Sequence, residues 1–129
     1  MAVAMRYRDV AAASAWLATA FGFRTKALIT GAEGRVSSAH LTLGSGMVLL
    51  ESVGETGFDS FMRQPDEIGG AETQSAYLIV ADADAIYARA KAAGAQIVSE
   101  IRDEAYGGRG FSCRDLEGHL WNFGTYDPW

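Results

Sequence analysis

Cysteine, clusters of basic residues and long apolar runs are scarce in this 129-residue sequence, and each scarcity excludes a class of protein. The single cysteine, Cys113, cannot form an internal disulfide, and the chain has neither a Cys-x-x-Cys pair nor the Cys/His spacing of a zinc site. Disulfide-stabilised and zinc-stapled folds are therefore excluded. A cytoplasmic location is the simplest setting for such a chain.

The lack of long apolar runs and basic clusters limits the possible partners. No apolar run approaches the roughly 20 residues that a membrane-spanning helix needs. The first residues carry Arg6 and Arg8 with no apolar signal core after them, so we expect no export signal. The net charge is −5 and the basic residues are dispersed, whereas phosphate binding needs a basic patch. We therefore expect neither a membrane nor a nucleic acid as partner.

A β-hairpin near the C-terminal end is the clearest local feature that the sequence does contain. Its predicted parts are a strand at Gly110–Arg114, a turn at Asp115–Gly118 and a strand at His119–Thr125. Trp121 and Phe123 lie two residues apart, so they share one face of the second strand. We expect both side chains to lie in the core.

The remainder of the chain consists of two similar halves. Asp9 and Gly22 are the cap residues expected at the two ends of a first helix, and Asp82 and Gly94 are their counterparts for a second helix. In the first half, the predicted strands are Ala2–Tyr7, Phe23–Thr30, Arg35–Leu43 and Met47–Val53. In the second half, they are Gln74–Val80 and Ala95–Ile101 together with the two strands of the hairpin. Each half is therefore a βαβββ module, and internal duplication is the strongest fold signal in the sequence.

This duplication predicts an α+β fold in which two tandem βαβββ modules form half-barrels. A helix covers one face of each sheet, and the other faces are free to curl around a cavity. The length indicates one domain over residues 1–129, with a first module at about 1–53 and a second at about 74–129. The polar, glycine-rich segment between them, residues 54–73, is predicted to be a linker with one short helical turn near Phe58–Met62.

Four short segments carry a resemblance to a known family. They are Arg6–Val10, Ala20–Phe23, Ala92–Ala95 and Asp115–Trp121, and their order on duplicated βαβββ units covers the whole chain. With these segments the chain resembles the vicinal-oxygen-chelate superfamily of glyoxalases, bleomycin-resistance proteins and extradiol dioxygenases. The resemblance implies the half-barrel fold but not a reaction, because this scaffold hosts lyases, transferases, dioxygenases and binding proteins.

The resemblance also identifies four positions at which metal-dependent members carry their ligands. In this chain these positions are occupied by Ala2, Glu51 or its neighbour, Ser75 and Asn122. Only Glu51 has a side chain of the right type, since alanine cannot ligate, serine ligates poorly and the asparagine amide is weak. We therefore predict no metal and no cofactor.

Strand alternation leaves one alternative metal site as a possibility. His40 and Glu51 lie on neighbouring predicted strands with inward-facing side chains, and His119 begins the last strand. A cluster of these three residues is conceivable. Against it, His119 has the same parity as Trp121 and Phe123, which face the helices.

Two functions are compatible with these observations. The first is a metal-free binding protein that sequesters a small, planar aromatic molecule such as an antibiotic or another natural product. Its predicted ligand-binding residues are His40, Met47, Leu49, Phe58, Phe61, Tyr77, Tyr106, Ser112, Asn122 and Trp129.

The second function is catalytic. Glu51 is the best acid/base candidate, because a partly apolar cavity raises the pKa of a carboxyl group. The enzyme would be a metal-free isomerase that uses Glu51, or a lyase or dioxygenase with atypical metal ligands. Glu51 could instead be an exposed strand-end residue or the ion-pair partner of Arg6. In either case a homodimer is expected, because family members of this size complete each cavity with a second chain.

Overall fold

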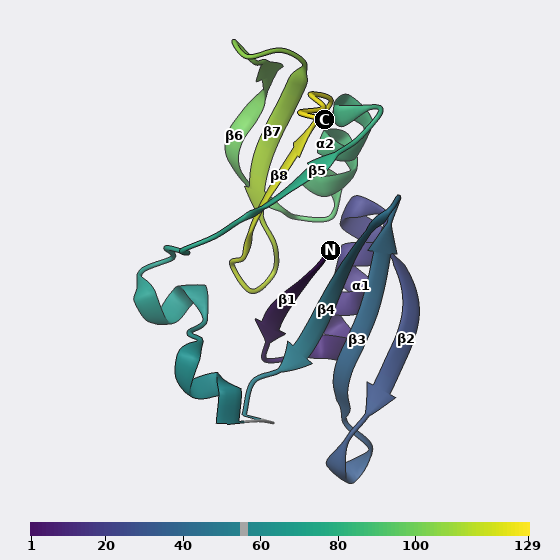
Figure 1. Ribbon diagram of the computed structural model, residues 1–129, viewed down its shortest axis with the longest axis vertical. Helices are drawn as coiled ribbons and strands as arrows, with labels where there is room; N and C mark the ends of the chain where they lie inside the picture. Colours follow the sequence, from purple (N-terminus) through teal and green to yellow (C-terminus); the bar gives the residue numbers. More distant parts are fainter. Residues whose placement is uncertain (55–56) are drawn as a thin grey trace.

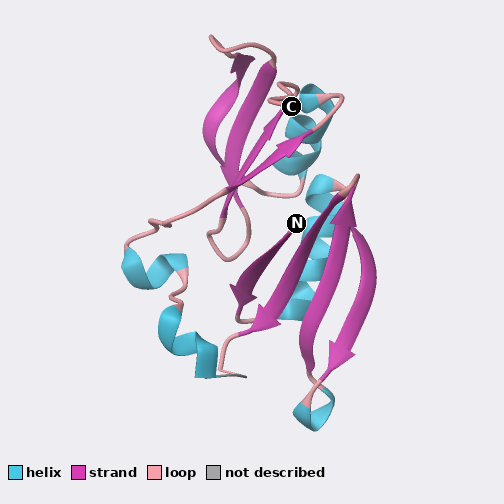
Figure 2. Ribbon diagram, in the orientation of Figure 1, coloured by secondary structure: helices cyan, strands magenta, loops and turns pink. Residues whose placement is uncertain are grey.

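The computed structural model describes residues 1–54 and 57–129 and shows an α+β fold made of two βαβββ modules (Figures 1 and 2). The first module consists of β1 (Ala2–Tyr7), α1 (Val10–Phe21), β2 (Arg24–Thr30), β3 (Val36–Leu43) and β4 (Gly46–Ser52). The second consists of β5 (Ala76–Ile79), α2 (Ala83–Ala92), β6 (Gln96–Asp103), β7 (Arg109–Arg114) and β8 (Leu120–Gly124). The short 3-10 helices are η1 (Ala32–Gly34), η2 (Gly57–Phe61) and η3 (Pro65–Ile68).

The two sheets have the same strand order, which confirms the predicted duplication. The first sheet runs β1-β4-β3-β2 and the second β5-β8-β7-β6. In each sheet the first strand pairs in parallel with the last strand of its module, and the other pairs are antiparallel. Consequently β1 and β5 are edge strands with one hydrogen-bonded neighbour each, as are β2 and β6.

The cap residues of α1 act as the sequence predicts. The side chain of Asp9 accepts a hydrogen bond of 2.9 Å from the backbone N–H of Ala12, and Gly22 ends the helix in the left-handed region with φ 86°. A Cβ atom at position 22 would lie 2.9 Å from Nη1 of Arg89 on α2, so an added side chain would displace the flexible end of that arginine. The left-handed φ is therefore the main reason for a glycine at this position.

The two modules share one core, which lies between the sheets and the adjacent helices (Figure 1). Phe21 of α1 packs against Trp121 and Phe123 of β8, with ring centroids 5.4 and 4.6 Å apart. Trp121 is 0% exposed and Phe123 1% exposed, which confirms the expectation that both are core residues. Trp16 also donates a hydrogen bond of 3.0 Å to the carbonyl of Ala93 at the end of α2. The modules are therefore joined by aromatic packing and not by the linker alone.

The turn between β7 and β8 is organised by the buried carboxylate of Asp115. Its Oδ2 accepts hydrogen bonds from the Tyr7 hydroxyl at 2.5 Å and from Trp121 Nε1 at 2.9 Å. Its Oδ1 accepts from the backbone N–H groups of Glu117 and His119, at 2.9 and 3.1 Å. One carboxylate therefore connects β1 of the first module to the hairpin of the second.

The described part of the predicted linker forms a strap that passes through η2 and η3 beside β1 and leads to β5 (Figure 1). Positions 55 and 56 of this segment lie outside the described residues. Gln64 is 2% exposed and donates a hydrogen bond of 3.1 Å to Glu117 in the hairpin turn. The guanidinium of Arg114 donates to the carbonyl of Gly70 at 2.7 Å, and Arg8 pairs with Asp66 at 2.7 Å. Hydrogen bonds and an ion pair thus attach the strap to both modules.

Among the described residues, no helix has the length and apolar content that would allow it to cross a membrane.

Candidate ligand-binding site

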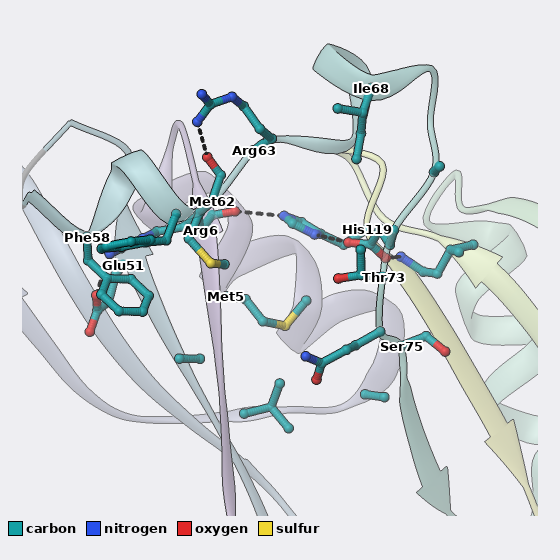
Figure 3. A pocket seen from close by; sticks show the side chains of 18 of the residues that line it. Met5, Arg6, Glu51, Phe58, Met62, Arg63, Ile68, Thr73, Ser75 and His119 are labelled. Carbon is teal, nitrogen blue, oxygen red and sulfur yellow. Dashed lines mark hydrogen bonds and ion pairs between the residues drawn. The ribbon is translucent and has the colours of Figure 1, made fainter.

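A pocket of about 850 Å³ lies between the β1 edge, the linker strap and the start of β5 (Figure 3). Its walls come from five parts of the chain: β1, the end of β4, the linker, β5 and the beginning of β8. The volume is within the range of sites that hold drug-sized ligands. The lining residues are Met1, Val3, Ala4, Met5, Arg6, Glu51, Phe58, Phe61, Met62, Arg63, Ile68, Ala71, Glu72, Thr73, Gln74, Ser75, Ala76, Tyr77, His119 and Leu120.

Methionine and phenylalanine dominate the apolar part of this lining. Three of the four methionines in the chain, Met1, Met5 and Met62, contribute to it. The rings of Phe58 and Phe61 lie with their centroids 5.4 Å apart, and they are 58% and 78% exposed. Methionine side chains are flexible and polarisable, so such a surface adapts to ligands of different shape. The exposed rings offer faces on which a planar molecule can stack.

Arg6 forms one polar end of the pocket. The side chain is 6% exposed, and its Nη1 pairs with Oε2 of Glu51 on β4 at 2.5 Å. Its Nε lies 3.3 Å from Asp59 in the linker, and its guanidinium carbon lies 5.6 Å from the ring centroid of Phe58. Arg6 thus connects β1 to β4 and to the linker, and it orients one of the exposed rings.

His119 forms the other polar end. Its side chain is 7% exposed, and its Nε2 lies 2.7 Å from the carbonyl oxygen of Arg6. Its Nδ1 lies 2.7 Å from Oε1 of Glu72, whose Oε2 accepts a hydrogen bond of 2.8 Å from the Leu120 backbone N–H. Figure 3 shows His119 between β1 and the last part of the linker. Both polar ends therefore attach the linker to strands of the two sheets.

Four of the residues proposed from the sequence as binding or catalytic residues line this pocket: Glu51, Phe58, Phe61 and Tyr77. Glu51 is half-exposed and paired with Arg6, which is one of the two alternatives that the sequence left open. Tyr77 is 39% exposed, and its hydroxyl donates a hydrogen bond of 2.8 Å to the Tyr126 carbonyl. Its ring is thereby held at one end while a face stays accessible.

Three further candidates lie together on the open face of the first sheet, outside the pocket. In the β3–β4 register His40 is the partner of Leu49, and Met47 is two residues further along the same face of β4. All three are half-buried, and the face turned toward α1 instead holds Leu41 and Leu50. The alternation predicted for these strands is confirmed.

Ser112 and Asn122 lie on the corresponding open face of the second sheet. Asn122 is the register partner of both Tyr77 on β5 and Ser112 on β7, so the three side chains share this face. The amide of Asn122 accepts from the Ser112 hydroxyl at 2.6 Å and donates to Ser75 Oγ at 2.9 Å and to the Ala76 carbonyl at 3.0 Å. A ligand at this face would meet an amide that is already hydrogen-bonded.

The two remaining candidates, Tyr106 and Trp129, lie apart from the pocket lining. Tyr106 packs edge-on against Tyr126 with centroids 5.1 Å apart, at the far end of the second module. Trp129 is fully exposed. Tyr106 is nevertheless connected to Tyr77 through Tyr126, whose carbonyl accepts a hydrogen bond from the Tyr77 hydroxyl.

The donor set does not fit the metal centre of metal-dependent relatives. No group of three or more His, Cys, Asp or Glu side chains suited to a metal ion occurs among residues 1–54 and 57–129. Of the conceivable cluster, Glu51 is paired with Arg6, and both ring nitrogens of His119 face other partners. Ala2, Ser75 and Asn122 supply no strong ligand.

Cys113 is a core residue and not a reactive thiol. It is 0% exposed, and burial, with a smaller contribution from the charge of Asp115, raises the pKa of its thiol to about 12. At neutral pH the thiolate, which is the reactive form, is therefore hardly populated.

The sequence interpretation missed the two anchors of the strap, Glu72 and Gln64, and the methionine lining. One signal was present in the linker composition, because Phe58, Met62 and Ile68 stand in an otherwise polar, glycine-rich segment. Large apolar residues in a linker indicate that one of its sides is covered or binds something. For Glu72 and Gln64 the sequence holds no such signal, because their partners lie 48 and 53 residues away, at Leu120 and Glu117.

Comparisons with known proteins agree with this architecture. The model of the family described as the Glyoxalase/Bleomycin resistance protein/Dioxygenase superfamily matches residues 2–123. The crystal structure of TioX from Micromonospora sp. ML1 is 36% identical, with a TM-score of 0.78 over 96% of this chain and 95% of that one.

Two more distant structures share the fold. The crystal structure of UcmS2 is 22% identical with a TM-score of 0.75, over 97% of this chain and 96% of that one. A glyoxalase/bleomycin resistance protein/dioxygenase family enzyme from Burkholderia phytofirmans PsJN is 18% identical with a TM-score of 0.69, over 95% and 94% of the two chains. No curated protein matches this chain.

Proposed function

Because the chain belongs to the glyoxalase/bleomycin resistance protein/dioxygenase superfamily, we propose that it binds a small, planar, largely apolar molecule and sequesters it, as a resistance protein sequesters an antibiotic or another natural product. The observation that carries this proposal is the methionine- and phenylalanine-lined pocket. Its charged groups Arg6 and Glu51 are paired with each other, as are His119 and Glu72, whereas a catalytic site needs an acid, a base or a metal directed at the substrate.

The accessible rings in the pocket lining indicate the class of ligand. Phe58 and Phe61 are exposed although aromatic side chains favour burial, and Tyr77 presents a ring across the pocket on β5. A flat aromatic molecule would stack on these rings and displace water from them. A small α-oxoaldehyde adduct, in contrast, needs a metal to polarise its oxygens.

A second copy of the chain is the partner that we propose for the open sheet faces. Ile29, Ile79 and Val98 are between 43% and 52% exposed on the strands of the two sheets, and β1 and β5 are sheet edges. Exposed edges and apolar faces favour association. In such a homodimer His40, Met47 and Leu49 of one copy would meet Tyr77, Ser112 and Asn122 of the other.

Light scattering at micromolar concentration tests the homodimer. We expect a mass of about 28 kDa, twice the 13.8 kDa of the chain. A mass of a single chain at that concentration would contradict the dimer while leaving the pocket proposal in place.

Fluorescence titration with N-phenyl-1-naphthylamine, an uncharged planar probe, tests ligand binding, and calorimetry with planar aromatic natural products extends the test. Phe58→Ala and Tyr77→Ala should each weaken binding by about 1–3 kcal/mol, the scale of a buried aromatic anchor. Leu116→Ala is the control, because Leu116 is an exposed large apolar residue of the hairpin turn that does not line the pocket. If the wild type bound none of these compounds, yet turned over a methylglyoxal–thiol adduct with added nickel or zinc, the chain would be an enzyme.

A further inference from the structure

The contact between His119 and Glu72 is a buried polar interaction that joins the linker to residues of β1 and β8. Glu72 is 16% exposed and His119 is 7% exposed, and both belong to the pocket lining. Residues 71–75, which include Glu72, form a continuous stretch of the pocket wall. Arg114 holds the Gly70 carbonyl just before this stretch and Asn122 holds Ser75 at its end, so Glu72 is the attachment of its middle.

The hydrogen-bond geometry determines the protonation state of the imidazole. Nε2 lies 2.7 Å from the Arg6 carbonyl oxygen, which can only accept, so this nitrogen carries a proton. Nδ1 lies 2.7 Å from Oε1 of Glu72, and an ionised carboxylate also only accepts. Both nitrogens must donate at once, which only the imidazolium can do.

The surroundings of the ring favour this charged form. Burial by itself lowers the pKa of His119, but the hydrogen bond to Glu72, the charge of Asp115 and the Arg6 carbonyl outweigh it, so the pKa is raised from its ordinary value of 6.5. From β1, the ring of Tyr7 lies 4.6 Å away by centroids. Glu117 and Arg114 are the other charged side chains of the hairpin turn, and they bond to Gln64 and to the Gly118 carbonyl.

From this geometry we propose that Glu72 and His119 are a positioning pair for the ligand pocket, and that the wall formed by residues 71–75 stays closed only while His119 is protonated. The proposal rests on the proposed ligand-binding function for its effect on affinity. Neither residue need touch the ligand.

Loss of the Nδ1 proton of His119 breaks its contact with Glu72 for an electrostatic reason. When pH rises, the Nδ1 proton passes to solvent, while Nε2 keeps its proton on the Arg6 carbonyl. The Nδ1 lone pair then faces the Glu72 carboxylate across 2.7 Å, and two acceptors at hydrogen-bond distance repel each other. Glu72 then moves out toward water, and Leu120 loses the acceptor of its N–H. The wall around Glu72 loses its attachment to β8, while Ser75 stays bonded to Asn122.

The variant Glu72→Gln removes the negative charge at position 72 and keeps the shape of the side chain. The amide oxygen of glutamine can still accept from the Leu120 N–H, and the amide nitrogen can donate to the neutral Nδ1 of His119. The pocket wall then closes without the extra proton. Asp66→Asn is the matched control, because Asp66 is a linker carboxylate with an arginine partner, Arg8, and lies outside the pocket.

The first experiment measures the affinity for N-phenyl-1-naphthylamine between pH 5.5 and 9.5. For the wild type and for Asp66→Asn we expect a constant affinity at low pH that falls about tenfold per pH unit above the pKa of His119. For Glu72→Gln we expect a flat profile. A flat wild-type profile, or a Glu72→Gln profile with the same fall as the wild type, would overturn the proposal.

A second experiment needs no ligand, so it separates a failure of this inference from a failure of the proposed function. Imidazole nitrogen shifts of the ligand-free protein report the protonation of His119, and a His40→Gln variant assigns the signals, because the chain has two histidines. Hydrogen exchange of the Leu120 amide, corrected for its intrinsic pH dependence, should lose about tenfold protection as His119 deprotonates. If protection stayed constant through that titration, the pair would not hold the wall, whether or not the probe binds.

Discussion

Replacing Asp115 tests the inference that one buried carboxylate joins the two modules. In Asp115→Ala the hydroxyl of Tyr7 and Nε1 of Trp121 both lose their acceptor, and both residues are 0% exposed. A buried donor left without a partner costs about 1–3 kcal/mol. The two side-chain donors together therefore predict a loss of about 2–6 kcal/mol in the free energy of unfolding, a large share of the 5–15 kcal/mol that is typical of a domain.

Urea unfolding at pH 7 and fixed protein concentration measures this loss. Asp115→Asn should lose less than Asp115→Ala, because the amide oxygen keeps one acceptor. Asp82→Ala is the control: it removes a carboxylate that accepts a single hydrogen bond of 3.0 Å from Ala85 at an exposed helix cap, and it should cost about 1 kcal/mol.

Tyr7→Phe in the Asp115→Ala background separates the loss of the Tyr7–Asp115 hydrogen bond from other destabilising effects of the substitution. There the phenylalanine should recover part of the loss, because it removes the unsatisfied hydroxyl. If Asp115→Ala were as stable as Asp82→Ala, the carboxylate would not be the connection that the hydrogen bonds indicate.

Four other outcomes follow from the structure. Gly22→Ala should lower the free energy of unfolding by about 1–2 kcal/mol in urea unfolding, because the position needs a left-handed φ and lies against another side chain. Native protein should leave Cys113 unmodified by iodoacetamide at pH 8, and denatured protein should react, since a pKa of about 12 keeps the thiol protonated. The raised pKa of His119 stabilises the fold fully below pH 6.5, and this contribution disappears as pH rises through the folded-state pKa, so the urea midpoint of the wild type should fall there and that of Glu72→Gln should not. Elemental analysis after purification without chelator should find no stoichiometric zinc, nickel, iron or manganese, because Glu51 is the one strong ligand at the four positions that bind metal in relatives.

The fold was predictable because its signals are local. Asp9 and Gly22 cap a helix whose apolar residues recur at helical spacing, and the structure has that helix at Val10–Phe21. The same pattern in the second half predicts the second module, and alternation in β8 predicts that Trp121 and Phe123 are buried. Caps, periodicity and turns involve residues a few positions apart, so they can be identified without the tertiary structure.

The site was only partly predictable, because the linker decides it. Alternation placed His40, Leu49 and Tyr77 on the open faces of the sheets, and the structure agrees. The pocket, however, lies where the linker crosses the β1 edge, and no periodicity predicts the path of an irregular segment.

The sequence by itself therefore determined the duplicated α+β architecture, the two helix ends and the faces of the strands, since each depends on neighbours within one element. Only the tertiary structure decided that Arg6 pairs with Glu51 and Asp59, and that His119 lies between the Arg6 carbonyl and Glu72. His119 and Arg6 are 113 residues apart, and His119 and Glu72 are 47 apart. Charges at such separations meet only when the two modules and the linker have packed. This packing gives His119 the two acceptors that favour an imidazolium, and it makes the polar linker one wall of the pocket.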